Sequence, residues 1–275
     1  MLKFTEDFEV GSGRTVQIDI KKELYSAKTN FQDIAVLDTV PYGRMLTLDG
    51  IIQLTQFDNH AYHEMLTHVP MQLCDAKKVL IIGGGDGGVL KEVIKYKNVQ
   101  EIVLCDIDPE VTKISKEYFE EFRAAFLDTR AIVIHEDAAE YVKHKKDYFD
   151  VVLIDSSDPI GPAIVLYEQE FYQNVYNSLT KDGIMAAQME SMYFHQEFIK
   201  ERLTTQREMF NSSEYYYTMI PTYPGGSIGF SLCKKGSSKD TKTSLDSKSL
   251  DELKYYTKEI HDASFVLPKF MADQI

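Results

Sequence analysis

The sequence contains no tryptophan, only three cysteines in 275 residues, and no apolar run of the roughly 18 residues that a membrane-spanning helix needs. The N-terminal segment MLKFTEDFEVGSG has acidic residues and no apolar core, so we expect no secretory signal peptide. The three cysteines, Cys74, Cys105 and Cys233, show no metal-ligand spacing, which favours free thiols in a reducing compartment. We therefore expect a cytoplasmic protein without a membrane partner.

Positive charge is also scarce, with 30 Lys and Arg against 43 Asp and Glu and a formal net charge of −13. Nucleic-acid binding needs clustered basic residues that neutralise phosphates, so we expect no nucleic-acid partner. The excess of acidic residues permits a cationic ligand. A generic acidic surface explains the charge equally well.

Residues 15–55 consist of short alternating apolar runs separated by turn residues. The runs cover residues 15–20, 33–38, 44–48 and 51–54, and Asp49-Gly50 separates the last two. An Asp-Gly pair between alternating runs is a strong hairpin signal. The sequence therefore predicts a small antiparallel β domain over residues 1–57.

From residue 58 onward the pattern changes to helices alternating with strands. Residues 60–73 have helical spacing, and continuous apolar runs occur at 78–82, 101–105, 131–134 and 149–154. Such runs, separated by segments long enough for helices, are typical of a parallel sheet covered on both faces. Segments 183–188 and 215–232 are expected to extend that sheet. Residues 58–275 are therefore predicted to form a Rossmann-like α/β domain.

A glycine cluster at residues 83–88, GGGDGG, follows the first of these strands and precedes a helical stretch at 89–96. Glycines at this point let the backbone turn tightly and approach a ligand beside a helix N-terminus. The G-x-G-x-x-G pattern within it is weak evidence, and dinucleotide binding is an alternative. A carboxylate inside the loop, Asp86, would repel a pyrophosphate and attract a cationic amine.

Acidic residues also follow the next two strands. Asp106 lies 18 residues after Gly88, at the position of a carboxylate that binds ribose hydroxyls. Asp108 precedes Pro109 and is expected to cap the following helix. Asp137 is placed for an adenine amino group, although a helix cap is an equally open interpretation. Together these residues indicate a nucleoside ligand on a Rossmann-like sheet.

The segment 155–163, DSSDPIGPA, follows another predicted strand, where open α/β sheets place their active sites. Its two carboxylates, Asp155 and Asp158, are three residues apart, and turn chemistry alone could explain them. Several acids around one pocket are costly unless the ligand is cationic, because like charges repel in a medium of low dielectric constant.

Taken together, these motifs resemble those of the spermidine synthases. The matching segments extend from about residue 5 to residue 270 and comprise 62–64 (YHE), 83–88, 155–163, 220–225 (IPTYPG) and the tail from 255 onward. The resemblance implies a Rossmann-like domain of the S-adenosylmethionine methyltransferase type with a small N-terminal antiparallel β domain. It also implies transfer of the aminopropyl group of decarboxylated S-adenosylmethionine to a diamine. Putrescine is the expected acceptor, giving spermidine and 5′-methylthioadenosine.

The resemblance assigns roles to individual residues. Asp155 matches the proton-acceptor position. The positions that touch the amine or the aminopropyl group are Tyr62, His63, Asp86, Asp158, Gln188 and Tyr223. The nucleoside positions are Gln32, Asp106, Asp137, Ala138 and Pro162. Decarboxylated S-adenosylmethionine is a co-substrate, no other cofactor and no metal is implied, and a homodimer or homotetramer is expected.

The sequence departs from the family near the expected amine pocket, where it has Gln56, Asp58 and Asn59 in place of an acidic pair. Lys3-Phe4 and Tyr193 stand where tryptophans are common. These changes leave cadaverine, agmatine or spermidine open as the acceptor. A methyltransferase, a non-catalytic polyamine sensor and a nicotinamide dehydrogenase are the alternatives for the whole protein. The acids Asp86, Asp155 and Asp158 argue against the first, Asp155 against the second and Asp86 against the third.

Overall fold

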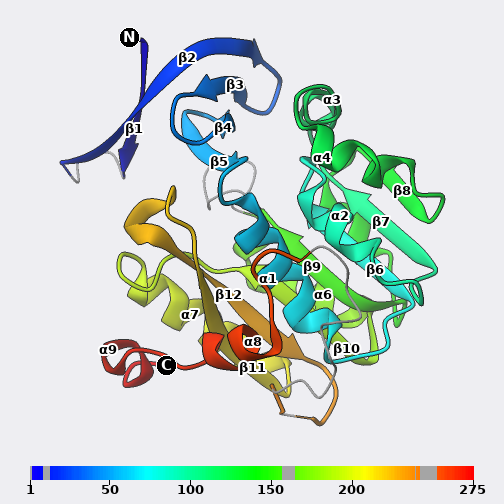
Figure 1. Ribbon diagram of the computed structural model, residues 1–275. Coiled ribbons are helices and arrows are strands. Elements are labelled where there is room, and N and C mark those ends of the chain that lie inside the picture. The colour runs from blue at the N-terminus through cyan, green and yellow to red at the C-terminus, as the bar shows by residue number, and fades with distance from the viewer. Residues whose placement is uncertain (1, 9–12, 157–164, 239, 242–252) are drawn as a thin grey trace.

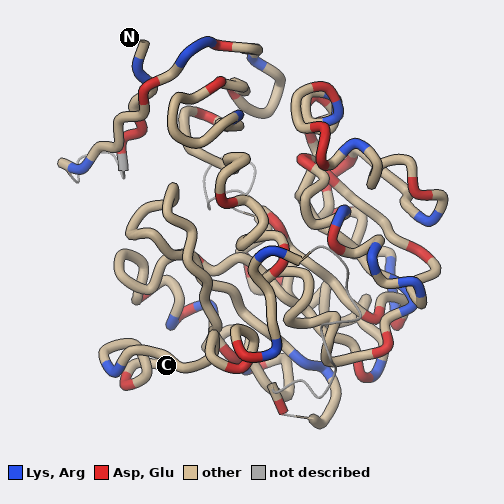
Figure 2. Tube along the Cα trace, viewed as in Figure 1, with Lys and Arg blue, Asp and Glu red and all other residues tan. Residues whose placement is uncertain are grey.

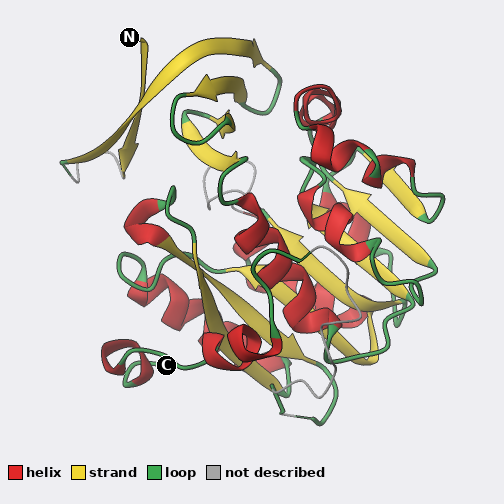
Figure 3. Cartoon of the chain, viewed as in Figure 1, coloured by secondary structure: helices red, strands yellow, loops and turns green. Residues whose placement is uncertain are grey.

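The protein, seen here as a computed structural model, is described for residues 2–8, 13–156, 165–238, 240–241 and 253–275 (Figure 1). These residues form two β-sheets. The N-terminal part consists of strands and loops, whereas helices cover both faces of the second sheet (Figure 3). This division agrees with the predicted fold class.

The N-terminal sheet has five antiparallel strands in chain order. They are β1 (Leu2–Phe8), β2 (Arg14–Lys28), β3 (Asp33–Thr39), β4 (Arg44–Leu48) and β5 (Ile51–Thr55). The predicted hairpin between β4 and β5 is confirmed. Asp49 (φ 50°) and Gly50 (φ 78°) both adopt the positive φ that a tight two-residue turn requires.

Alternation along the strands gives this sheet two apolar faces. On β3, Ile34 and Val36 pack against Ile114 and Phe122 of the second part, while Leu37 faces the opposite cluster. The first face therefore docks the N-terminal sheet onto the α/β part.

The second sheet has seven strands in the order β11-β12-β10-β9-β6-β7-β8. Their bounds are β6 (Lys78–Gly83), β7 (Glu101–Cys105), β8 (Ala131–Ile134), β9 (Phe149–Asp155), β10 (Leu179–Gln188), β11 (Ser212–Met219) and β12 (Ser227–Lys234). Strands β10, β9, β6, β7 and β8 are parallel, and β12 and β11 extend the sheet antiparallel. The predicted extension is thus confirmed.

Both faces of this sheet are buried. On β6, Val79 and Ile81 belong to one core cluster and Leu80 and Ile82 to the other. The covering helices are α1 (Asn59–Met71), α2 (Gly88–Val93), α3 (Pro109–Tyr118), α4 (Glu120–Arg123), α5 (Ala138–Lys143), α6 (Gln169–Ser178), α7 (Gln196–Met209), α8 (Lys258–Ser264) and α9 (Lys269–Ala272). Two-sided burial explains the continuous apolar runs in the sequence. Helix α2 ends earlier than the 89–96 stretch predicted.

The chain runs from β6 to β7 and β8 and then returns to β9 on the other side of β6. The topological switch point therefore lies between β6 and β9, where open α/β sheets bind their ligands. Gly83 at the end of β6 pairs directly with Asp155 at the end of β9. This register brings together two motifs that are far apart in the sequence.

Helix α1 is anchored to the C-terminal segment by a buried carboxylate. Glu64 accepts hydrogen bonds from the backbone N–H groups of Lys254 (2.9 Å), Tyr255 (2.8 Å) and Tyr256 (2.8 Å). The C-terminal segment is thereby fixed to the helix that carries Tyr62 and His63.

Acidic and basic residues are spread over both parts of the molecule (Figure 2). Within the part of the chain that the structure describes, no helix combines the length and apolarity needed to cross a bilayer. Cys74, Cys105 and Cys233 are free thiols.

Candidate functional site

A cavity of about 910 Å³ lies at the switch point and is lined by both parts of the chain. Ten of the residues that the sequence predicted for the site line it: Gln32, Tyr62, His63, Asp86, Asp106, Asp137, Ala138, Asp155, Gln188 and Tyr223. The other two, Asp158 and Pro162, lie outside the described residues. The structure therefore brings together every predicted site residue that it describes.

The glycine loop is shaped by close approach to two of these residues. At Gly83 (φ 72°), an added Cβ would lie 2.1 Å from the carbonyl oxygen of Asp155, and at Gly88 it would lie 2.1 Å from the ring of His63. The Asp86 carboxylate accepts the backbone N–H of Gly88 at 2.5 Å. Glycine at both positions is therefore needed to hold Asp86 beside His63 and Asp155.

Asp106 follows β7 and is held by two backbone donors. Its Oδ2 accepts the N–H of Gly85 (2.8 Å) and its Oδ1 accepts the N–H of Asp108 (2.8 Å). Burial raises the pKa of Asp106 to about 6, helped by the nearby carboxylates of Asp108 and Asp86 and opposed by the two backbone hydrogen bonds. Since Asp106 occupies the Gly85 N–H, that donor does not face a phosphate in this loop.

The predicted helix caps are confirmed. Asp108 caps α3 through the N–H of Glu110 (3.0 Å) and also accepts a hydrogen bond from Gln32 Nε2 (3.1 Å). Asp137 caps α5 through the N–H of Ala139 (2.8 Å) while still lining the cavity. Gln32 is thus tied to the acidic segment after β7 rather than standing alone.

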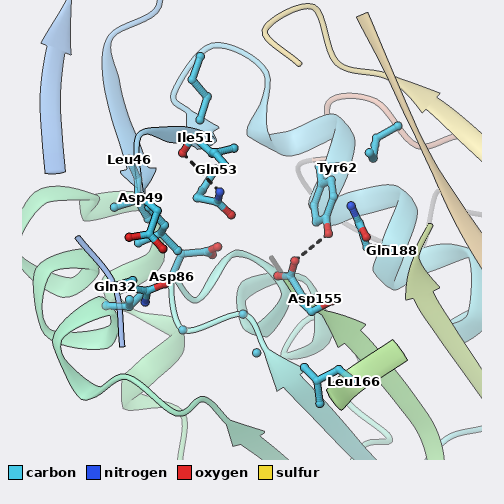
Figure 4. A pocket seen from close by; sticks show the side chains of 18 of the residues that line it. Gln32, Leu46, Asp49, Ile51, Gln53, Tyr62, Asp86, Asp155, Leu166 and Gln188 are labelled. Atoms are coloured by element: carbon cyan, nitrogen blue, oxygen red, sulfur yellow. Dashed lines mark hydrogen bonds between the residues drawn. The ribbon is translucent and has the colours of Figure 1, made fainter. Parts of the chain in front are cut away.

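Asp155 is the most perturbed carboxylate of the site. Its Oδ1 accepts a hydrogen bond from the Tyr62 hydroxyl at 2.8 Å (Figure 4). Its Oδ2 is buried and has no hydrogen-bond partner among the described residues. Burial raises the pKa of Asp155 to about 7, and the nearby Asp86 carboxylate adds to the rise while His63 opposes it. This carboxyl can therefore take up and release a proton near neutral pH.

His63 lies on helix α1 and faces the carboxylates of Asp86 and Asp155. Its Nε2 lies 3.6 Å from Asp86 Oδ1, and the side chain is only 4% exposed. Burial by itself lowers the pKa of His63, but the carboxylates of Asp86 and Asp155 outweigh this and hold the pKa above its ordinary value. A lone histidine on an apolar helix would be a core residue, whereas this one belongs to a charged cluster.

Aromatic rings form one wall of the cavity. The ring of Tyr62 lies 6.1 Å from that of Tyr223 and 5.2 Å from that of Phe230. The Tyr223 hydroxyl donates to the backbone carbonyl of Gln53. The ring of Tyr223 is therefore the part available to a ligand, which suits an alkyl chain or a cation.

Sequence reasoning missed Ser156, Glu190 and His195, which line the cavity, and Tyr167, which contacts the predicted Gln188. Gln188 is held by the hydroxyl of Tyr167 (3.1 Å), which also bonds Ser156 Oγ (2.9 Å). Glu190 and His195 line the cavity and face each other at 3.3 Å. Glu190 follows β10 much as Asp155 ends β9, which is the signal that could have identified it.

Gln56, Asp58 and Asn59 do not line the cavity, so the expectation that they build the wall of the amine pocket directly is wrong. The buried Asp58 carboxylate accepts hydrogen bonds from Thr55 Oγ1 (2.6 Å) and the Thr222 N–H (2.9 Å). Asn59 donates to a backbone carbonyl, and Gln56 faces Glu121 on the exterior. Asp58 thus ties α1 to the loop before Tyr223.

The N-terminal strand does reach the cavity, although not through the residues expected. Thr5, Glu6 and Asp7 of β1 line it, whereas Lys3 and Phe4 line a separate hollow on the N-terminal sheet. The described walls of the cavity therefore carry acids from β1, the glycine loop, and the ends of β7, β9 and β10.

Comparison with known proteins gives a consistent result along the whole chain. Residues 59–243 match the family model described as a spermine/spermidine synthase domain, and residues 4–56 match the spermidine synthase tetramerisation domain. A polyamine aminopropyltransferase of Leptospira biflexa is 42% identical over 97% of this chain and 95% of its own length. A spermidine synthase of Dictyostelium discoideum is 40% identical over 99% and 96%.

Solved structures agree. A spermidine synthase crystallised with the transition-state analogue AdoDATO superposes with a TM-score of 0.95 at 35% identity, covering 99% of this chain and 94% of that one. The spermidine synthase of Thermotoga maritima gives a TM-score of 0.93 at 35% identity, covering 100% and 94%.

Proposed function

The chain belongs to the spermidine synthase family, and from that premise we propose that it transfers the aminopropyl group of decarboxylated S-adenosylmethionine to a diamine. The observation that carries the proposal is the cavity carboxylate of Asp155, whose Oδ2 has no described partner and whose pKa is raised to about 7. A cationic substrate provides the partner that Asp155 Oδ2 lacks, and the amine nucleophile provides the proton that Asp155 takes up.

The donor lies along the carboxyl ends of β6, β7 and β8. Its ribose is bound by Asp106 and its adenine by the segment Asp137–Ala138, with Gln32 supporting Asp106 through their shared neighbour Asp108. Pro162 completes the adenine side by family resemblance. The aminopropyl group then extends from the sulfonium toward His63 and Asp86.

The acceptor lies against the aromatic wall of Tyr62 and Tyr223, with its reacting nitrogen beside Asp155 and with Gln188 and Asp158 as further contacts. Putrescine is the acceptor that fits a spermidine synthase. The rings of this wall can bind the methylene groups of a four-carbon chain and any charged nitrogen.

The reaction requires a neutral amine. A free alkylamine has a pKa of roughly 10, judged from lysine, so it enters as an ammonium ion. Asp155 removes one proton, and the nitrogen lone pair then attacks the propyl carbon bound to sulfur. The new C–N bond forms as the C–S bond breaks, and the bonding electrons return to sulfur to give neutral 5′-methylthioadenosine. The protein contributes alignment of nitrogen, carbon and sulfur, together with this proton transfer.

The test is product identification. The protein is incubated with decarboxylated or ordinary S-adenosylmethionine and a panel of putrescine, cadaverine, agmatine and spermidine, and products are identified by mass. We expect an aminopropyl adduct of putrescine and stoichiometric 5′-methylthioadenosine from the decarboxylated donor. A methylated product, or binding without turnover, would refute the proposal.

Three further expectations accompany this function. The match of residues 4–56 to a tetramerisation domain supports a homo-oligomer, and light scattering after size exclusion distinguishes a dimer from a tetramer. Turnover is expected to need no added cofactor, so dialysis against a chelator should leave it unchanged. A cytoplasmic location is a prediction from the usage of cysteine.

A further inference from the structure

The charged cluster of the cavity has a composition that suits more than an ammonium ion. His63, Asp86 and Asp155 each offer one possible ligand atom, and these three atoms all lie within 4.8 Å of one another. An imidazole with two carboxylates is a donor set that divalent transition ions favour, whereas Mg²⁺ and Ca²⁺ prefer oxygen ligands alone. Acidic residues at a surface are common without an ion, so composition is only a starting point.

Geometry supplies the second observation. Ligand bonds of about 2.1 Å in a tetrahedral site place neighbouring ligand atoms about 3.4 Å apart. His63 Nε2 and Asp86 Oδ1 are 3.6 Å apart, which is longer than a hydrogen bond and close to that ligand spacing. The His63 side chain is buried and directed at the cluster. Since the three ligand atoms lie within 4.8 Å of one another, the Asp155 oxygen needs to approach the other two by at most about 1.4 Å to reach that spacing.

Asp155, the third ligand, has a carboxylate oxygen available to bind an ion. Asp155 Oδ2 is buried without a hydrogen-bond partner among the described residues, while its Oδ1 is held by Tyr62. Asp86 is held in turn by the N–H of Gly88. Hydrogen bonds of this kind orient ligand carboxylates toward a metal ion.

We propose that His63, Asp86 and Asp155 form a binding site for a divalent transition ion, with Zn²⁺ or Co²⁺ as suitable ions, in the enzyme that lacks its aminopropyl donor. The ion takes the place of the cationic aminopropyl group, a placement that rests on the proposed function. Binding of the ion therefore excludes the donor, and the ion acts as a competitive inhibitor rather than a cofactor. The nucleoside part of the cavity stays open, so 5′-methylthioadenosine and the ion bind together.

The test uses Co²⁺ as a spectroscopic probe of the full-length protein. We expect one Co²⁺ per chain with visible absorption bands of a low-coordinate site, displaced by Zn²⁺ and unaffected by millimolar Mg²⁺. His63→Asn and Asp86→Asn should each weaken Co²⁺ binding more than about tenfold, because loss of even a residue that only orients a metal ligand costs roughly 10–100-fold. His144→Asn is the matched control, since His144 is exposed and outside the cavity. Circular dichroism checks that each variant is folded.

The outcomes separate the two proposals. No Co²⁺ spectrum in the unaltered protein, or the same spectrum in both site variants, would overturn the ion site whatever the enzyme's activity. Release of Co²⁺ by decarboxylated S-adenosylmethionine but not by 5′-methylthioadenosine is the expected result. If Co²⁺ binding depends on His63 and Asp86 but the donor does not displace it, the ion site stands and the proposed place of the aminopropyl group is wrong.

Discussion

Replacing Asp155 by Asn removes one negative charge while keeping the shape of the side chain. The amide oxygen can still accept the hydrogen bond from Tyr62 that Asp155 Oδ1 accepts at 2.8 Å. What is lost is the ability to take a proton from the attacking amine. General-base catalysis contributes typically about 10²–10⁴-fold, so turnover should fall by that factor while affinity for 5′-methylthioadenosine changes little.

The same substitution should stabilise the ligand-free protein. The folded-state pKa of Asp155 is about 7, against an ordinary value of 3.8. For an acid with a raised folded-state pKa, the contribution to stability is fully present below the unfolded pKa and is lost as pH rises through the folded pKa. The loss therefore develops between about pH 4 and pH 7. At 1.36 kcal/mol per pKa unit, a difference of about three units gives an upper bound of about 4 kcal/mol.

Two measurements check this reasoning. Single-turnover kinetics with saturating donor and amine report the chemical step, and urea unfolding at pH 4.5 and pH 8 reports stability. Asp155→Asn should unfold at higher urea than the unaltered protein at pH 8 and should differ less at pH 4.5. Turnover within tenfold of the unaltered enzyme would show that Asp155 is not the base, and lower stability at pH 8 would show that it is not an uncompensated charge.

Three other predictions concern the surrounding residues. Binding of 5′-methylthioadenosine should weaken as pH falls below about 6, because Asp106 (pKa about 6) is then protonated and accepts ribose hydroxyls less well. Calorimetric titration measures this affinity, and Asp106→Asn should abolish its dependence on pH. Glu64→Gln should lower the free energy of unfolding in urea by about 2–3 kcal/mol, because a buried charged acceptor of three N–H groups is replaced by a weaker neutral one. Glu140→Gln, at an exposed position, is the control and should change that free energy by less than about 0.5 kcal/mol. Gly88→Ala should reduce kcat/KM at least tenfold, because the new methyl group overlaps the ring of His63, and unchanged kinetics would contradict the observed packing.

Features that depend on neighbouring residues could be predicted from the sequence. The Asp49-Gly50 turn follows from the need for positive φ at two successive residues, and the Asp108-Pro109 start of α3 follows from the capping of free backbone N–H groups. The apolar runs of the parallel strands follow from burial on both faces. The family motifs identified the site residues, of which ten line one cavity.

Features that depend on distant contacts could not. The amino-acid sequence alone gives no sign that Asp58 accepts a hydrogen bond from Thr222, or that Glu190 and His195 contact each other in the cavity. Nor does it indicate that Tyr167 holds Gln188. Each of these interactions joins segments whose separation is set by strand order and helix packing.

The sequence by itself determined the local turns, the helix caps and the two-part architecture, because these follow from backbone geometry and from the types of residue present, and its family motifs identified the acids that line the cavity. The tertiary structure decided which of these acids has a pKa near neutral pH. Asp155 acquires its raised pKa only because β6 and β9 pair in a register that buries it beside Asp86 and His63. Burial and charge proximity are properties of the folded chain, and they convert an ordinary carboxylate into a group that exchanges protons near neutral pH.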